Sequence, residues 1–366
     1  MLKVGLVGLP NVGKSTLFNA LARAEARVSS YPFTTIDSNV GVAVVPDPRL
    51  ARLEALLDPL DTTPCAIEFI DIAGLVEGAS RGEGLGNRFL GSIRTVDLIA
   101  HVVRLFDQPD VAHGYPGLDP VRDAEIVQTE LLLADLEVLG RAIEKRSKVW
   151  ATDPGAHAGE RELLERCRTR LEEGRPLASL ELDAAARVEL EAVGMLTTKP
   201  VVWVANLSES EVGPQEPPAV EELGWALGEE GRPAEVVALS ALLEAELAAL
   251  EEDDRREMLE MLSLPASGLE RLVERCFDRL GLIRFYTVAN RKLRAWELPR
   301  GVAAPAAAGR IHSDMESGFI RARVASFDEL VAAGGLAELA HQGRLRTEGK
   351  EYQIRDGDVV EFLFSR

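Results

Sequence analysis

The stretch Gly8-Leu9-Pro10-Asn11-Val12-Gly13-Lys14-Ser15 decides the fold of this chain. It matches the pattern GxxxxGK(S/T) and comes directly after the apolar run 2–7, which is typical of a buried strand. The glycines let backbone N–H groups close around phosphate oxygens, and the N-terminus of the helix expected over 14–24 adds a partial positive charge. The stretch therefore predicts a strand, a loop and a helix that together hold the phosphates of a nucleotide.

A magnesium site is expected beside this loop. Lys14 would reach the β- and γ-phosphates, and Ser15 would ligate Mg²⁺. Asp71 follows the apolar run IEFI and opens the sequence DIAG, so its carboxylate would hold Mg²⁺ through water. Gly74, the last residue of DIAG, would offer its N–H to the γ-phosphate. These residues predict a metal-dependent nucleotide hydrolase.

A switch threonine is expected between these two motifs, in the segment YPFTT over 31–35. A threonine hydroxyl at such a position completes the magnesium shell when the γ-phosphate is present. Thr35 is the expected metal ligand, and Thr34 is the alternative.

The sequence that would recognise the base favours adenine. Asn206-Leu207-Ser208-Glu209 follows the run VVWVA, where most P-loop GTPases have NKxD, whose aspartate accepts two hydrogen bonds from guanine. Here Leu207 replaces the lysine and would pack on the base, while the longer Glu209 misplaces the carboxylate. A buried polar mismatch costs about 1–3 kcal/mol, which is enough to reverse a preference. The backbone N–H groups that follow the run EVVAL would also face the base, from Ser240, Ala241 and Leu242.

The rest of the pattern indicates an α/β chain with two additions. Short apolar runs alternate with helical segments, which predicts a doubly wound, mostly parallel sheet. Leucines at helical spacing on both sides of Asp153-Pro154-Gly155 predict two antiparallel helices inserted in the nucleotide domain, the first over about 125–148. The segment 281–366 predicts a small α+β domain with a turn at Asp356-Gly357-Asp358. The runs expected to form strands are 2–7, 65–70, 98–103, 201–205, 235–239, 283–288, 293–298 and 359–364.

Composition limits the partners and the compartment. The net charge of −19 should repel nucleic acid overall, so no DNA partner is expected and an RNA contact needs a local basic patch. No apolar run is long enough to cross a bilayer, so no membrane partner is expected. The three cysteines lie far apart without a CxxC pair, which favours a reducing compartment and a cytoplasmic location.

Basic side chains gather at two places. Arg141, Lys145 and Lys148 fall on one face of the first inserted helix, which is suited to contact ribosomal RNA phosphates. A solvated face of a coiled coil is an equally good interpretation. The stretch Arg291-Lys292-Leu293-Arg294 lies beside Trp296, and this pairing of charge with an aromatic ring suits RNA.

Taken together, these segments resemble the YchF or Obg-like ATPase family, a branch of the translation-factor GTPases. The resemblance covers nearly the whole chain and includes NVGKST over 11–16, YPFTTI, DIAGLVEGASRGEGLGNRFL over 71–90, NLSE, RAW, GFIRA and DGDVVEFLF. It implies a nucleotide domain over 1–124 and 197–280, a coiled-coil arm over 125–196, and a C-terminal TGS domain of ubiquitin-like β-grasp fold over 281–366. It also implies hydrolysis of ATP in preference to GTP, and association with ribosomes or ribosomal subunits through the TGS domain or the arm.

The resemblance further implies roles for single residues. Asn11 resembles a loop asparagine that helps hold potassium in related enzymes, so K⁺ is a second candidate cofactor beside Mg²⁺. Leu75 stands where many GTPases have the glutamine that orients water, so hydrolysis should proceed near or below about 10⁻² per second. His113 aligns with a histidine proposed in this family to approach that water, which makes it a candidate catalytic residue together with Lys14. The residues implied in phosphate binding are Asn11, Val12, Gly13, Lys14, Ser15 and Thr16.

Two other classes of function remain open on the sequence alone. One is a GTPase that acts in ribosome assembly or translation, and the length of Glu209 speaks against it. The other is a scaffold whose bound nucleotide only sets the position of the arm, and Leu75 keeps this alternative open because it has no hydrogen-bonding group.

Overall fold

The computed structural model describes residues 2–25, 39–72, 85–112 and 114–365, and the chain divides into two units. The first unit comprises Met1–Ala24, Asp37–Gly41 and Glu68–Leu272, and the second comprises Glu25–Ile36, Val42–Ile67 and Val273–Arg366. Residues 42–67 thus group with the C-terminal part of the chain, although the sequence placed them in the nucleotide domain. The finer division at 125, 197 and 281 stays a prediction.

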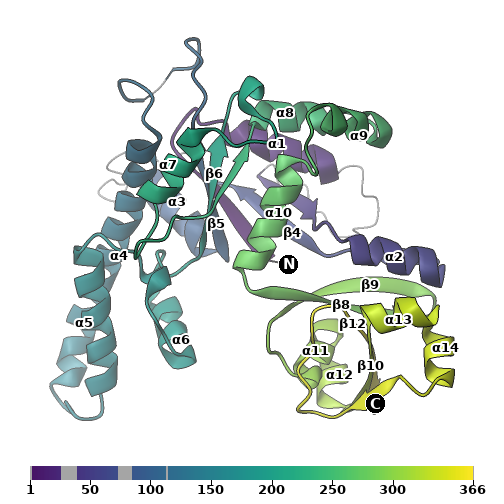
Figure 1. The fold of residues 1–366 in the computed structure, drawn as a ribbon. Coiled ribbons are helices and arrows are strands. Elements are labelled where there is room, and N and C mark those ends of the chain that lie inside the picture. Colours follow the sequence, from purple (N-terminus) through teal and green to yellow (C-terminus); the bar gives the residue numbers. More distant parts are fainter. Residues whose placement is uncertain (1, 26–38, 73–84, 113, 366) are drawn as a thin grey trace. The chain divides into compact units, whose positions relative to one another are not determined.

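A six-stranded sheet carries the nucleotide loop (Figure 1). Its strand order is β2-β4-β1-β5-β6-β7, and the pairs β1–β5, β5–β6 and β6–β7 are parallel. This doubly wound arrangement confirms the α/β fold expected from the alternating runs. The strands are β1 (Leu2–Val7), β2 (Val40–Val44), β4 (Ala66–Asp71), β5 (Leu98–Arg104), β6 (Val201–Asn206) and β7 (Val236–Leu239).

Helices alternate with these strands along the chain, as a parallel sheet requires. Among the described residues, no helix combines the length and the apolar character that crossing a bilayer demands. The helices of this part are α1 (Lys14–Glu25), α3 (Leu85–Arg94), α7 (Pro218–Ala226), α8 (Ala241–Leu247), α9 (Glu252–Met261) and α10 (Gly268–Arg279).

Strand β5 lies in the interior of the sheet, between β1 and β6, and all seven of its residues are buried. The His101 ring packs on Trp203 of β6, with 4.7 Å between the ring centroids. Burial lowers the pKa of His101 to about 3, so this histidine stays neutral near pH 7. The strand ends at Arg104, which is also buried and leads into the loop that borders the candidate site.

An arm of three helices is inserted between β5 and β6: α4 (Pro120–Trp150), α5 (Ala158–Glu172) and α6 (Ala184–Val193). The paired helices α4 and α5 confirm the expected hairpin, while α6 was not predicted (Figure 1). Helix α4 begins earlier than expected because the Asp119 side chain caps the N–H of Arg122 and Pro120 occupies the first turn. The buried residues that join the three helices are Leu132, Leu139, Trp150, Leu164, Cys167, Leu171, Leu177, Leu190 and Met195.

Asp135 fastens the end of this arm to α4. Its buried carboxylate accepts hydrogen bonds from the N–H of Leu196 at 2.7 Å and from the N–H and hydroxyl of Thr197 at 2.8 and 2.7 Å. Burial raises the pKa of Asp135, and these hydrogen bonds oppose that rise by stabilising the carboxylate. The contact fixes the point at which the chain returns from the arm to β6.

The second unit is a mixed sheet with helices against it, in the order β11-β10-β12-β8-β9-β3. Strands β8 and β9 form an antiparallel hairpin, β12 runs parallel to β8, and β10 is antiparallel to β12. This arrangement confirms the expected β-grasp fold. The strands are β3 (Asp61–Thr63), β8 (Leu282–Ala289), β9 (Lys292–Pro299), β10 (Phe319–Ser326), β11 (Arg346–Glu348) and β12 (Asp358–Phe364). The helices are α2 (Pro48–Leu57), α11 (Ala304–Ile311), α12 (Ser313–Ser317), α13 (Phe327–Ala333) and α14 (Leu336–His341).

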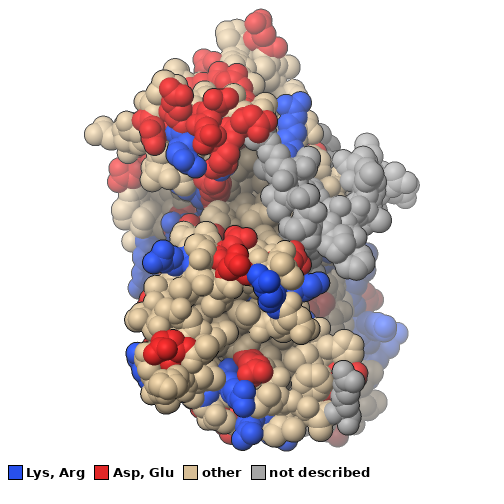
Figure 2. Space-filling view, turned by 90° about the vertical axis from the view of Figure 1, so that its right-hand side faces the viewer, with Lys and Arg blue, Asp and Glu red and all other residues tan. Residues whose placement is uncertain are grey.

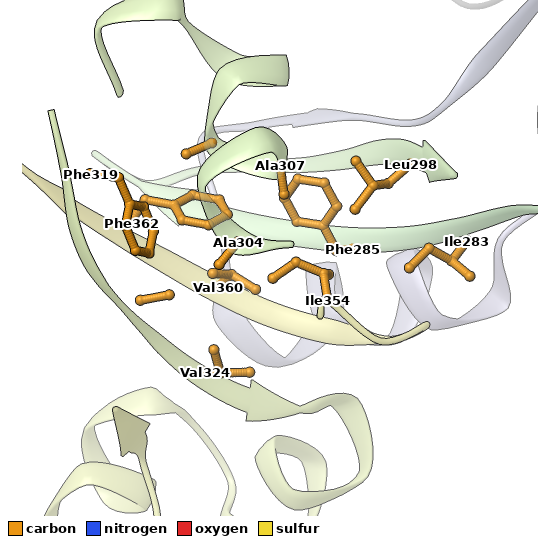
Figure 3. Close-up of a cluster of buried hydrophobic side chains, with 12 residues drawn as sticks. Ile283, Phe285, Leu298, Ala304, Ala307, Phe319, Val324, Ile354, Val360 and Phe362 are labelled. Atoms are coloured by element: carbon orange, nitrogen blue, oxygen red, sulfur yellow. The ribbon is translucent and has the colours of Figure 1, made fainter. Parts of the chain in front are cut away.

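Small and aromatic side chains together fill the core of this unit (Figure 3). Phe285 of β8 meets the edge of Phe362 of β12 with ring centroids 6.0 Å apart, and Ala304 and Ala307 let α11 approach the sheet closely. The turn predicted at 356–358 is present, with Gly357 at a φ of +87°, a backbone conformation that glycine adopts readily. The hairpin, helix and closing strand thus form one continuous core.

Candidate nucleotide-binding site

Two glycines of the loop between β1 and α1 have no room for a side chain. A Cβ on Gly8 would lie 2.6 Å from the carbonyl oxygen of Val102, and a Cβ on Gly13 would lie 2.1 Å from the Asn206 amide nitrogen. Gly13 also has a φ of +91°, and Asn11 has a φ of +63°. The loop therefore curls tightly against β5 and β6, in the form that a phosphate cradle requires.

Lys14, Ser15 and Asp71 form a polar cluster at the start of α1 and the end of β4. The Lys14 ammonium, which is 8% exposed, contacts Oδ1 of Asp71, and the Ser15 hydroxyl donates to Oδ2 at 3.2 Å. A hydroxyl and a carboxylate are hard oxygen ligands of the kind that Mg²⁺ takes together with phosphate oxygens. The residues present therefore fit the metal that the sequence predicted.

Asn206 joins the phosphate loop to the loop after β7. Its amide nitrogen donates to the carbonyl of Val12 at 2.8 Å, and its amide oxygen accepts from the N–H of Ala241 at 2.8 Å. The side chain is 3% exposed, so both hydrogen bonds are made away from water. Asn206 thus positions both loops, in addition to lying at the pocket itself.

A cavity of about 280 Å³ lies at the carboxyl ends of the parallel strands. Open α/β sheets commonly bind ligands at this edge. Nine residues expected from the sequence line it: Asn11, Gly13, Thr16, Asn206, Leu207, Glu209, Ser240, Ala241 and Leu242. Ser208 lines it as well, and Val12 takes part through the carbonyl that Asn206 binds.

One wall of this cavity was not foreseen from the sequence. Phe106, Gln108 and Val111, from the loop after β5, face it. The signal in the sequence was Arg104 at the end of the apolar run LIAHVV, followed by an aromatic residue in RLFDQPDV. Arg104 is 3% exposed, and its guanidinium binds the carbonyls of this loop.

The residues at the base side of the cavity are mainly apolar. Leu207 is 4% exposed and packs into the protein, whereas Leu242 is 46% exposed and lies at the rim. Glu209 lies in the short helix after β6, is exposed, and is among the residues that line the cavity. Such a lining offers dispersion contacts to a flat ring and one acceptor group at its edge.

Asn11 lies at the mouth of the phosphate loop. Its amide nitrogen donates to the carbonyl of Ala112 at 3.1 Å and so links this loop to the one after β5. The amide oxygen is the part of this side chain that would ligate K⁺ in the role that the resemblance implies.

Several expected site residues fall outside the described part of the chain. They are the switch threonines Thr34 and Thr35, Gly74 and Leu75 after the DIA stretch, and His113. Their roles stay predictions.

Comparisons with known proteins cover the whole chain. The family model described as 50S ribosome-binding GTPase matches residues 3–135, and the model YchF-GTPase_C, described as a protein of unknown function, matches residues 282–365. The chain is 43% identical to the ribosome-binding ATPase YchF of Bacillus subtilis over 100% of this chain and 99% of that protein. It is 42% identical to the protein of the same name from Escherichia coli O157:H7 over 99% of both chains.

Two solved structures share the fold of this chain. The YchF GTPase of Schizosaccharomyces pombe superposes with a TM-score of 0.89 at 31% identity and covers 99% of this chain and 97% of that one. A GTP binding protein from Pyrococcus horikoshii OT3 shares the fold, with a TM-score of 0.61 at 19% identity over 100% of both chains. Identity above two fifths over the full length, together with the matched site motifs, leads to one conclusion: this chain belongs to the YchF family of P-loop nucleotide hydrolases.

Proposed function

We propose that this chain binds and hydrolyses ATP with Mg²⁺ and acts on the ribosome as a slow regulatory switch. The observation that carries the proposal is the cavity that joins a tightly curled phosphate loop to an apolar base side with Glu209 at its edge. The relatives from Bacillus subtilis and Escherichia coli are named ribosome-binding ATPases, which supports both halves of the proposal.

The chain's own residues would divide the work at the phosphates. The N–H groups of the loop and the Lys14 ammonium would hold the triphosphate, while Ser15 and Asp71 would hold Mg²⁺. When bound, the metal would neutralise charge that builds up on the transferred phosphoryl group. Thr35 would complete the metal shell, and Gly74 would offer its N–H to the γ-phosphate. The residues that would face the base are Asn206, Leu207, Glu209, Ser240, Ala241 and Leu242.

Catalysis would depend on groups beside the phosphate loop. His113 would approach the attacking water, because Leu75 cannot orient it. Asn11 would hold K⁺ near the phosphates, with its amide oxygen as the ligand. A slow rate suits a switch that reports which nucleotide is bound, and a ribosomal partner would place the chain in the cytoplasm.

Base preference gives the direct test of the nucleotide. ATP should bind more tightly than GTP, and Glu209→Asp should narrow the difference because the shorter carboxylate can meet the two donors of guanine. We expect a change of roughly 5- to 150-fold in the affinity ratio, which corresponds to about 1–3 kcal/mol. Isothermal titration of both nucleotides with Mg²⁺ and either K⁺ or Na⁺ measures it.

Glu221→Asp serves as the matched control, because Glu221 is exposed on α7 and does not line the cavity. Tighter binding of GTP than of ATP by the unaltered protein would reject ATP as the substrate and favour the GTPase alternative.

Contact with ribosomal RNA would have to use local basic surfaces. Figure 2 shows acidic side chains gathered in the upper part of the view, where α8 and α9 of the first unit lie in Figure 1. The first turn of α9 contributes exposed Glu252, Asp253 and Asp254 to this region, which would repel phosphates. The candidate surfaces are therefore the exposed Arg141, Lys145 and Lys148 of α4 and the exposed Arg291, Lys292 and Arg294 of the second unit.

Binding to ribosomes should weaken as salt rises, because phosphate contacts release counterions. The three α4 residues, or Arg291, Lys292 and Arg294 of the second unit, are replaced by Glu. The plot of log affinity against log salt should then become less steep by about 1 for each phosphate that is no longer neutralised. Co-sedimentation with ribosomes across a salt series measures this slope. Neutralising the three acidic residues of α9 is the control and should not reduce it. Binding that is indifferent to salt would reject the phosphate contacts.

A further inference from the structure

The loop after β5 is held by one buried side chain. Arg104 uses all three of its guanidinium nitrogens on backbone carbonyls: Nε donates to Phe106 at 3.1 Å, Nη1 to Val111 at 3.1 Å and Nη2 to Gln108 at 3.2 Å. Its guanidinium carbon also lies 4.4 Å from the centre of the Phe106 ring. The three residues so held are the three that form the unforeseen wall of the cavity.

Backbone hydrogen bonds to Asn206 and within the loop also hold this segment. The N–H groups of Leu105 and Phe106 donate to the carbonyl of Asn206 at 2.9 and 3.2 Å, and the N–H of Val111 donates to Gln108 at 3.1 Å. These bonds set where the turn begins and how it closes, but none of them joins both of its ends. The Arg104 fork does so, because it reaches from Phe106 across to Val111.

The chemistry of the side chain explains why arginine is needed here. A guanidinium is planar and presents its donors in a fixed fork, so it can bind three carbonyls lying in different directions while stacking on a ring. A lysine ammonium is a compact point charge on a flexible stem and cannot reach the three carbonyls from one position. Arg104 itself does not line the cavity.

We propose that Arg104 is the positioning residue for the purine side of the nucleotide pocket: it folds the 106–111 turn so that Phe106, Gln108 and Val111 form a wall for the base. The inference rests on the proposed function, since it assigns these residues to a bound ATP. It concerns the base; the phosphate loop is linked to this part of the chain by the hydrogen bond from Asn11 to Ala112, one residue beyond the turn that Arg104 holds.

The separation of base from phosphates supplies the test. Arg104→Lys should weaken ATP binding by roughly 10- to 100-fold, because two of the three hydrogen bonds are lost. Inorganic tripolyphosphate has no base, so its affinity for the variant in the presence of Mg²⁺ should stay within about twofold of its affinity for the unaltered protein. Calorimetric titration of the full chain with ATP, GTP and tripolyphosphate measures these affinities. In the Arg104 variant, the ratio of ATP affinity to GTP affinity should fall as the ATP affinity falls.

Arg122→Lys is the matched control. Arg122 also donates to two backbone carbonyls, those of Pro116 and Gly117 at 3.0 Å each, but these residues lie further along the loop and do not line the cavity. Its replacement should leave all three affinities unchanged. If Arg104→Lys does not fold, Arg104→Gln keeps one donor group and is judged by the same ratio of ATP to tripolyphosphate affinity.

The outcomes separate this inference from the proposed function. Equal loss of ATP and tripolyphosphate in the Arg104 variant overturns the positioning role, and so does an unchanged affinity for ATP. An unaltered protein that binds tripolyphosphate as tightly as ATP has no wall for the base, which also overturns it. An unaltered protein that binds neither ligand rejects the proposed function instead.

Discussion

Replacing Lys14 with alanine will weaken the binding of Mg²⁺-ATP by roughly 10- to 150-fold, because a charge-assisted hydrogen bond contributes about 1.5–3 kcal/mol. Hydrolysis should fall by a further factor of about 10²–10³, since the ammonium would also stabilise charge that develops in the transition state. Equilibrium titration and single-turnover hydrolysis with saturating protein measure the two effects separately. Replacing Ser15 with alanine in addition should remove the dependence on Mg²⁺.

The contact between Lys14 and Asp71 calls for a control that separates stability from binding. Asp71 is only partly exposed, so the single Lys14 variant leaves its carboxylate without this partner and should unfold at a lower temperature. The double variant Lys14→Ala, Asp71→Asn removes that charge and should regain thermal stability without regaining nucleotide affinity. Affinity that survives in the variant lacking both Lys14 and Ser15 would contradict the assignment of the phosphate site.

Periodic and motif-rich parts of the chain could be predicted from the sequence. The five expected strands of the first sheet correspond to β1, β4, β5, β6 and β7, because each is a short, largely buried apolar run. The hairpin β8–β9 and the closing strand β12 were found in the same way. The phosphate loop was predicted from its motif, and the close backbone approach at Gly8 and Gly13 shows why glycine is needed at these positions.

Strand β2 and helix α2 were not predicted, although the apolar run 40–45 and the leucines spaced along 50–57 carry a readable signal; strand β3 was missed because it has no such signal. Strand β3 consists of Asp61, Thr62 and Thr63, and it joins the second sheet by pairing with Lys292, Leu293 and Arg294 of β9. Backbone hydrogen bonds hold such an edge strand and leave no hydrophobic pattern to read. Helix α2 is tied to the same unit by polar contacts far apart in sequence: Asp47 accepts from the Tyr286 hydroxyl at 2.9 Å, and Arg49 binds Asp356 at 2.7 Å.

The candidate site was predictable where a motif carries it and not where tertiary contacts do. Asn206 was chosen for its place in NLSE, but its two partners, Val12 and Ala241, are 194 and 35 residues away in the sequence. Phe106 and Val111 follow the signal at Arg104, which does not by itself point to a ligand, and only the folded structure shows that they face the cavity. A sequence motif thus locates the phosphates, whereas the shape of the base pocket emerges only when separate strand ends meet.

Replacing Asn206 with alanine should produce the second large effect, on stability and binding together. The change leaves the buried carbonyl of Val12 and the N–H of Ala241 without their partner, and each such loss costs about 1–3 kcal/mol. We expect the free energy of unfolding to fall by a few kcal/mol and ATP affinity to fall by at least about tenfold, because the phosphate loop and the loop after β7 are no longer joined. Denaturant unfolding and calorimetric titration measure the two quantities.

Two further variants decide whether the joining of the loops is the cause. Asn19→Ala makes the same substitution at an exposed position of α1 and should change stability by no more than about 0.5 kcal/mol, with ATP affinity unchanged. Asn206→Asp keeps an acceptor for the N–H of Ala241 but sets an oxygen against the carbonyl of Val12. It should therefore weaken the binding of tripolyphosphate as much as Asn206→Ala does. If the aspartate variant binds tripolyphosphate like the unaltered protein, the hydrogen bond to Val12 does not shape the phosphate loop, and Asn206 acts through the loop after β7 alone.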